Sequence, residues 1–128
     1  MTGGRDRRGK RRRLSRSAEF DRVYREGRSH ASRYLVVYAF PRSSDGDDAR
    51  LGVSVGRKVG GAVERTRMKR LLREAFWASA EGLPEGHDFV LVARPDSAKL
   101  ADERGGAGIA EALRELLEQA GLAGGATS

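Results

Sequence analysis

The most informative part of this sequence is residues 56–77, GRKVGGAVERTRMKRLLREAFW, which join a glycine-containing turn to an amphipathic helix. At about 100° per residue, five apolar side chains of the helix fall on one arc. They are Met68, Leu71, Leu72, Ala75 and Phe76. The rest of the circumference carries Arg65, Thr66, Arg67, Lys69, Arg70, Arg73 and Trp77. We therefore expect one face to pack in a core while the other presents a cationic surface.

Three of these cations, Arg65, Lys69 and Arg73, follow one another at i, i+4 and i+8 without an acid among them. Like charges at this spacing destabilise a helix by a few tenths of a kcal/mol per pair, roughly. An anionic partner explains the row better than a merely solvated face does. The adjacent glycines would let a phosphate backbone come close, so the stretch favours contact with a nucleic acid.

The charges are segregated along the chain. Lys and Arg number 25 against 18 Asp and Glu, which gives a net charge of +7. Residues 1–14 carry +6 and residues 57–77 carry +5, whereas residues 78–128 carry −5. Such segregation is typical of a nucleic-acid-binding protein.

Composition also excludes several classes of protein. The chain has no cysteine, so it has no disulfide framework, thiol nucleophile or thiolate metal site. Its longest apolar stretch, residues 35–40, is too short to span a bilayer, and no apolar segment follows the basic N-terminus as in a secretory signal. We expect a cytoplasmic protein.

No residue pattern predicts a catalytic or metal site. His30 and His87 do not have the spacing of metal ligands, and Asp45, Asp47 and Asp48 lack the pattern of an EF-hand loop. No catalytic triad or paired carboxylates can be assigned. We expect no catalytic residue in the protein and no metal or cofactor bound by the protein alone.

The pattern along the chain predicts an α+β fold in which helices pack over one open sheet. Residues 1–14 are predicted to be disordered until they meet a polyanion. A first helix should run from an N-cap at Ser17 to a stop at Gly27. The strand predicted at residues 34–40 is apolar on both faces and should be interior to the sheet, followed by a hairpin loop at 41–48 and a strand at 50–55.

After the basic helix, the glycines and proline of residues 82–86 should form a loop. A short buried strand is predicted at residues 89–93 and a loose loop at 102–108. A last helix should bury one apolar face, and residues 121–128 should fray. The face consists of Ile109, Leu113, Leu116 and Leu117.

The stretch at 56–77 resembles a motif of bacterial ribonuclease P protein subunits, which carry a glycine-containing turn, Ala-Val, an Arg-Asn-Arg core, then Lys-Arg and Arg-Glu on one helix. Matching spacing is found at residues 62–63, 65–67, 69–70 and 73–74. The resemblance runs from about residue 14 to residue 95 and more weakly through the last helix.

This resemblance implies a small two-layer sandwich of the ribosomal protein S5 domain 2-like type. Its sheet would be mostly antiparallel, with a left-handed crossover through the basic helix. It also implies a basic tail at residues 1–14, a ribonuclease P protein domain at 15–121 and a flexible tail at 122–128.

The function implied is that of a protein subunit of ribonuclease P, an endoribonuclease. The subunit would assist the RNA subunit in removing the 5′ leader from precursor tRNA, and it would strengthen and broaden substrate binding. Its partners would be the RNA subunit, one protein per RNA, and precursor tRNA. The RNA subunit would perform the hydrolysis with Mg²⁺.

The resemblance also assigns residues to RNA contacts. Those implied to bind the RNA subunit are Arg65, Thr66, Arg67, Lys69, Arg70 and Arg73. Those implied to line a cleft for the single-stranded leader are Phe20, Tyr24, Ser32, Arg33, Val36 and Tyr38. Further phosphate contacts are implied for Arg57, Lys58 and Trp77.

Some of these residues have a second interpretation. Spacing alone predicts that Phe20, Tyr24 and Tyr38 are core residues. The alternative is binding of the leader, because aromatic faces stack bases without demanding one sequence. Thr66 stands where the family usually has Asn, so it keeps a hydroxyl but lacks the amide. Trp77 stands where Arg is common, and both packing and RNA contact remain open for it.

Two other classes of protein share part of the pattern. A ribosomal or general RNA-binding protein would have the basic helix but no reason for an aromatic cleft. A protein-only nuclease would need a cluster of carboxylates for its metal.

Overall fold

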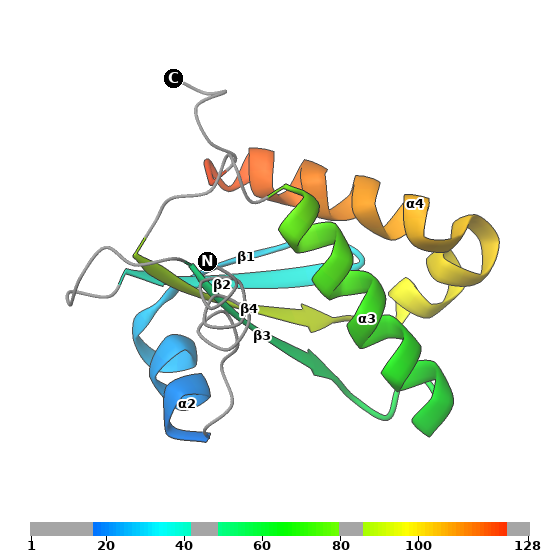
Figure 1. Cartoon of the computed structure of the whole chain (residues 1–128), viewed down its shortest axis with the longest axis horizontal. Helices are drawn as coiled ribbons and strands as arrows, with labels where there is room; N and C mark the ends of the chain where they lie inside the picture. Colours follow the sequence, from blue (N-terminus) through cyan, green and yellow to red (C-terminus); the bar gives the residue numbers. More distant parts are fainter. Residues whose placement is uncertain (1–16, 42–48, 80–85, 123–128) are drawn as a thin grey trace, which may run out of the picture.

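A computed structural model describes residues 17–41, 49–79 and 86–122, with side chains of the first helix described from Phe20 onward. Within these ranges the chain forms three helices and one sheet, and the α+β class is confirmed (Figure 1). The elements in order are α2 (Ser17–Glu26), β1 (Arg28–Ala31), β2 (Leu35–Pro41), β3 (Arg50–Val55), α3 (Ala62–Ala78), β4 (His87–Ala93) and α4 (Asp96–Gln119). The predicted tail at 1–14 and most of the predicted loops at 41–48 and 82–86 lie outside the described residues.

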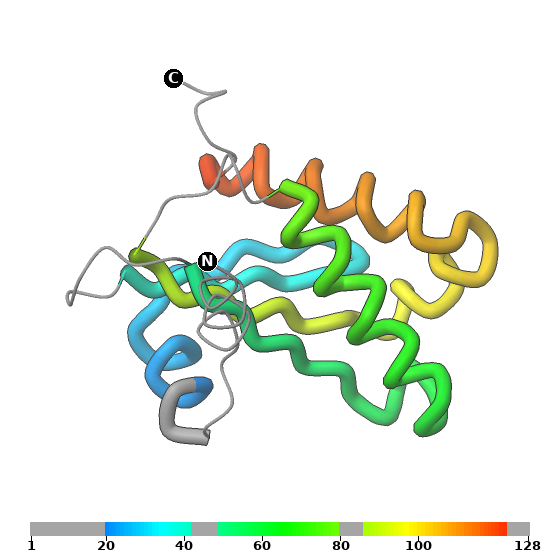
Figure 2. Tube along the Cα trace, viewed as in Figure 1, coloured from blue at the N-terminus to red at the C-terminus, as the bar shows by residue number. Residues whose placement is uncertain are grey.

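The four strands lie in the order β1-β2-β4-β3. β2 pairs antiparallel with β1 and β4, so its predicted interior position is confirmed. β3 pairs parallel with β4, and Figure 2 shows the chain crossing between them through α3. The left-handedness of this crossover stays a prediction.

One prediction about the strands was wrong, and one strand was missed. The segment at 41–48 does not close a hairpin, because β4 lies between β2 and β3. Its Gly and Asp residues are typical of a turn, but turn composition does not determine which strands pair. The strand β1 was not predicted, since its sequence RSHA is polar and mostly exposed.

α3 and α4 cover one face of the sheet. The buried residues of α3 are Met68, Leu72, Ala75 and Phe76, which confirms the predicted apolar arc. The predicted apolar face of the last helix is also buried. These side chains pack against alternate residues of the strands, such as Leu35, Val37 and Ala39 of β2.

α2 lies on the opposite face. Its Val23 is fully buried against Val90 of β4, and Phe20, Tyr38 and Phe40 pack around this pair while staying partly exposed. The helix ends at Glu26, and the N–H of Gly27 donates to the carbonyl oxygen of Val23 at 2.9 Å. A Cβ at Gly27 would lie 2.6 Å from that oxygen, so the predicted stop residue must be glycine.

The predicted loose loop at 102–108 was also wrong. α4 runs through this segment with a kink at Gly105, where φ is 62° and ψ is −155°. Within α4, Gly105 is the residue that departs from helical dihedrals, and its positive φ is one that glycine adopts without the steric cost of a Cβ. A Cβ at Gly106 would lie 3.2 Å from Leu71 of α3, so the glycines also allow close packing of the two helices.

Candidate RNA-binding surfaces

The cations of α3 lie on more than one side of the helix. The guanidinium of Arg67 lies 3.9 Å from the carboxylate of Asp102 on α4. Thr66 and Arg70 are exposed. Arg65, Lys69 and Arg73 are half-buried, and helical spacing puts their row on the flank away from α4. The six predicted residues therefore form a band around the helix, which we call the cationic band.

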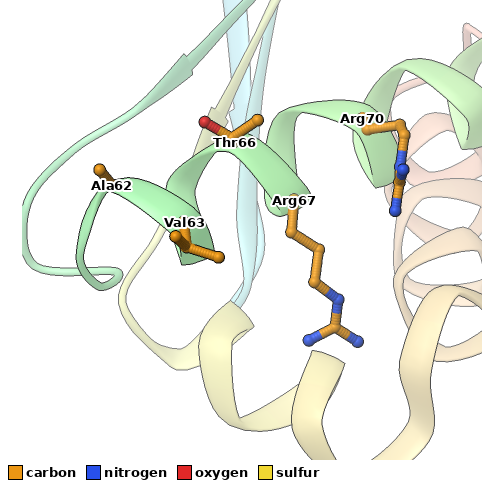
Figure 3. Close-up of a pocket in the computed structure, with 5 residues that line it drawn as sticks. All are labelled: Ala62, Val63, Thr66, Arg67 and Arg70. Carbon is orange, nitrogen blue, oxygen red and sulfur yellow. The ribbon is translucent and has the colours of Figure 1, made fainter.

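Three members of the band share a shallow depression of about 410 Å³. Figure 3 shows its lining, which consists of Ala62, Val63, Thr66, Arg67 and Arg70. Val63, Arg67 and Arg70 extend to the same side of the helix, and Ala62 and Thr66 complete the lining of the depression. The structure thus brings Thr66, Arg67 and Arg70 together, apart from the row that contains Arg65.

Arg57 and Lys58 lie in the turn that leads into α3. Both side chains are exposed, while Val59 between the turn and the helix is buried. The N–H of Gly60 donates to the carbonyl oxygen of Arg57 at 3.2 Å. A fixed turn therefore presents these two cations next to the start of the cationic band.

Trp77 is half-buried at the end of α3. Its ring meets that of the fully buried Phe76 edge to face, with centroids 4.9 Å apart. This contact favours the packing interpretation, because Trp77 joins the main core at its margin.

Three predicted aromatic residues meet across α2 and β2. The rings of Phe20 and Tyr24 have centroids 6.3 Å apart, and Tyr24 meets Tyr38 edge to face at 4.8 Å. Tyr24 is 37% exposed. Val36 lies on the same face of β2 as Tyr38. We call Phe20, Tyr24 and Tyr38 the aromatic cluster.

Ser32 and Arg33 lie in the turn between β1 and β2 and already have partners within the chain. The Ser32 hydroxyl accepts hydrogen bonds from the N–H groups of Tyr34 and Leu35, both at 3.2 Å. Arg33 donates to Asp96 at 3.0 Å, and this hydrogen bond raises the pKa of its guanidinium above the ordinary value. The Arg33 side chain remains 72% exposed and can still meet a phosphate.

Two features near the aromatic cluster were not predicted. Arg50 donates two hydrogen bonds of 2.8 Å to the buried carboxylate of Asp88, in register across β3 and β4. The guanidinium of Arg22 lies over the ring of Phe40 at 5.9 Å. Asp88 could have predicted this ion pair from the sequence, because it is an acid within the mostly apolar strand HDFVLVA. A buried carboxylate requires a partner.

The described residues form neither a metal site nor a membrane span. Within residues 17–41, 49–79 and 86–122, no group of three or more His, Cys, Asp or Glu side chains could hold a metal ion. None of the helices described there is long and apolar enough to cross a membrane.

Known proteins match both the sequence and the fold. A family model described as Ribonuclease P matches residues 9–121. The ribonuclease P protein component of Clostridium acetobutylicum is 38% identical over 112 residues, which cover 86% of this chain and 89% of that protein. That of Clostridium novyi is 37% identical over 110 residues, covering 86% and 94%.

Solved structures agree with these relatives. The RNase P protein of Staphylococcus aureus superimposes with a TM-score of 0.77 at 31% identity, covering 88% of this chain and 97% of that one. The Thermotoga maritima protein gives 0.74 at 31% identity, covering 84% and 96%. Sequence and fold agree over most of the chain, which therefore belongs to the family of bacterial ribonuclease P protein components.

Proposed function

We propose that this protein assists the RNA subunit of ribonuclease P in the endonucleolytic removal of the 5′ leader from precursor tRNA. The observation that carries the proposal is the presence of two separate surfaces suited to RNA. The cationic band lies on α3, which packs on one face of the sheet, and the aromatic cluster lies on the other face. One chain can thereby contact the RNA subunit and the leader at the same time.

The cationic band contacts the RNA subunit. Guanidinium groups form bidentate hydrogen bonds with phosphate oxygens, and the neutralised phosphates release their counterions. Binding of this kind lets two RNA chains approach each other at lower Mg²⁺. The exposed Arg57 and Lys58 extend the same surface along the turn.

The aromatic cluster binds the leader. Tyr24 offers part of its ring to solvent, and its edge-to-face contact with Tyr38 holds it in place. An unpaired base can stack on such a ring without being read by hydrogen bonds, so leaders of different sequence are accepted. Mature tRNA lacks a leader and gains nothing from this contact.

The RNA subunit supplies the chemistry. It hydrolyses the phosphodiester bond with its own Mg²⁺, which leaves a 5′-phosphate on the tRNA, and the protein binds no metal or cofactor by itself. One protein binds one RNA subunit, in the cytoplasm, where bacterial precursor tRNA is made.

Reconstitution with a bacterial ribonuclease P RNA tests this function. At low Mg²⁺, the RNA with the protein should cleave precursor tRNA at the mature 5′ end, and the RNA alone should not. A general RNA-binding protein would bind without restoring cleavage. Cleavage by the protein alone would indicate a protein-only nuclease and would contradict the proposal.

A further inference from the structure

Val63 is exposed in a way that folding does not explain. Among the described residues, two large hydrophobic side chains are exposed, Tyr24 and Val63. Tyr24 belongs to the aromatic cluster, whereas Val63 lies in the first turn of α3 with 78% of its surface exposed. A β-branched residue favours a helix less than alanine does, and at this exposure it gains nothing from burial.

The surroundings of Val63 combine apolar surface with positive charge. Val63 lines the depression on α3 with Ala62 and Thr66, and much of that lining is carbon. Arg67 and Arg70 follow Val63 by four and seven residues, and all three extend to the same side of the helix (Figure 3). The described lining residues include no acid, although Asp102 lies 3.9 Å from Arg67.

An unstacked nucleotide matches this combination. Its base offers a flat apolar face that can cover the methyl groups of Val63, and its phosphates are anionic. Guanidinium groups recognise phosphate through paired hydrogen bonds. Single-stranded loops and bulges are the parts of RNA whose bases are free to leave the stack.

We propose that Val63 is a base-contacting residue, on which an unstacked base of the RNA subunit packs. The flanking phosphates pair with Arg67 and Arg70, and the Thr66 hydroxyl donates to a phosphate oxygen. This inference rests on the proposed function, because the RNA subunit is the occupant. A nucleotide offers the apolar face and the anions in one ligand, so RNA is the occupant we infer, and a second copy of the chain is an outcome of the test below.

Salt dependence separates base packing from phosphate pairing. The variants are Val63→Ala, which removes the methyl groups and favours the helix, and Val63→Thr, which keeps the shape but makes it polar. Each should weaken binding to a bacterial ribonuclease P RNA about fivefold at every KCl concentration, with an unchanged slope of log K against log salt. Arg70→Ala, the matched variant, should also lower that slope by about one.

The outcomes distinguish the inference from the function on which it rests. Wild-type affinity in both Val63 variants, together with weaker binding by Arg70→Ala, would overturn the base contact and leave the function intact. Failure of the wild-type protein to bind the RNA would overturn the function itself. Self-association that is lost in Val63→Ala would overturn the inference in favour of an interface between copies.

Cross-linking locates the base. Because the chain has no cysteine, Val63→Cys provides a unique attachment point for a photoreactive group. Cross-links to an unpaired nucleotide of the RNA subunit would support the proposal, and cross-links confined to a helical region would contradict it. Glu118→Cys, on the exposed side of α4, is the matched control and should give no such cross-link.

Discussion

The two faces of the sheet differ in how completely they are covered. Under α3 and α4, large side chains such as Phe76, Phe89 and Leu91 are fully buried. Under α2, Val23 and Val90 are fully buried, and the rings around them remain partly exposed. The face under α3 and α4, which we call the well-covered face, therefore supplies most of the stability. The face under α2, which we call the thinly covered face, can offer aromatic rings to a ligand at little cost to the fold.

Removing a ring from each face should show the difference most strongly. Phe76→Ala should lower the free energy of unfolding by about 3–5 kcal/mol, because it leaves a cavity among fully buried side chains. Tyr24→Ala should cost about 1 kcal/mol or less, since this ring is partly exposed. Urea denaturation measures both changes. Equal losses would mean that α2 is as important to the core as α3.

The buried ion pair belongs to the thinly covered face. Asp88→Ala should lower the free energy of unfolding by about 3 kcal/mol, because it leaves the Arg50 guanidinium without its carboxylate. The double variant Arg50→Met with Asp88→Leu should recover much of that loss in the same urea experiment. If the double variant is as unstable as Asp88→Ala, the loss does not come from breaking the ion pair.

Half of the cationic band can be removed by three substitutions on α3. Replacing Arg65, Arg67 and Arg70 together by Ala should weaken binding to the RNA subunit on the order of a hundredfold at moderate salt and lower the salt slope by about three. Filter binding across a KCl series measures both quantities.

The matched control removes the same charge from α4, by replacing Lys99, Arg104 and Arg114 with Ala. It should have a much smaller effect on affinity. If the two triple variants bind alike, general charge rather than the cationic band accounts for RNA binding.

Trp77 lies at the margin between the well-covered face and solvent. Because it packs on Phe76, Trp77→Ala should lower the free energy of unfolding by about 1.5 kcal/mol. RNA affinity measured with the still-folded variant should change little. A loss of RNA affinity with unchanged stability would instead assign Trp77 to the RNA-binding surface.

Hydrophobic pattern alone predicted much of the well-covered face. The bounds of β3, the buried arc of α3 and the apolar face of α4 all follow from spacing, because each element presents one continuous apolar surface. The strand β1 could not be found in this way, since it is a polar edge. A loop was expected at 102–108, but the chain stays helical there and one glycine with a positive φ, Gly105, kinks the helix.

The candidate sites were predictable to different extents. The cationic band lies within one helix, so sequence spacing placed its members in order. The aromatic cluster joins α2 to β2, and its contacts depend on how α2 lies against the sheet. Spacing alone suggested core residues there, and the family resemblance was needed to group them. The contact of Arg67 with Asp102 was not predicted, because residue 102 was assigned to a loop.

The role of the thinly covered face is tested by comparing the wild-type protein with Tyr24→Ala in the reconstituted holoenzyme, using precursor and mature tRNA as ligands. Loss of the stacking ring should weaken precursor binding about tenfold and leave mature tRNA binding unchanged. Equal weakening for both tRNAs, or no change for either, would contradict the assignment of the thinly covered face to the leader.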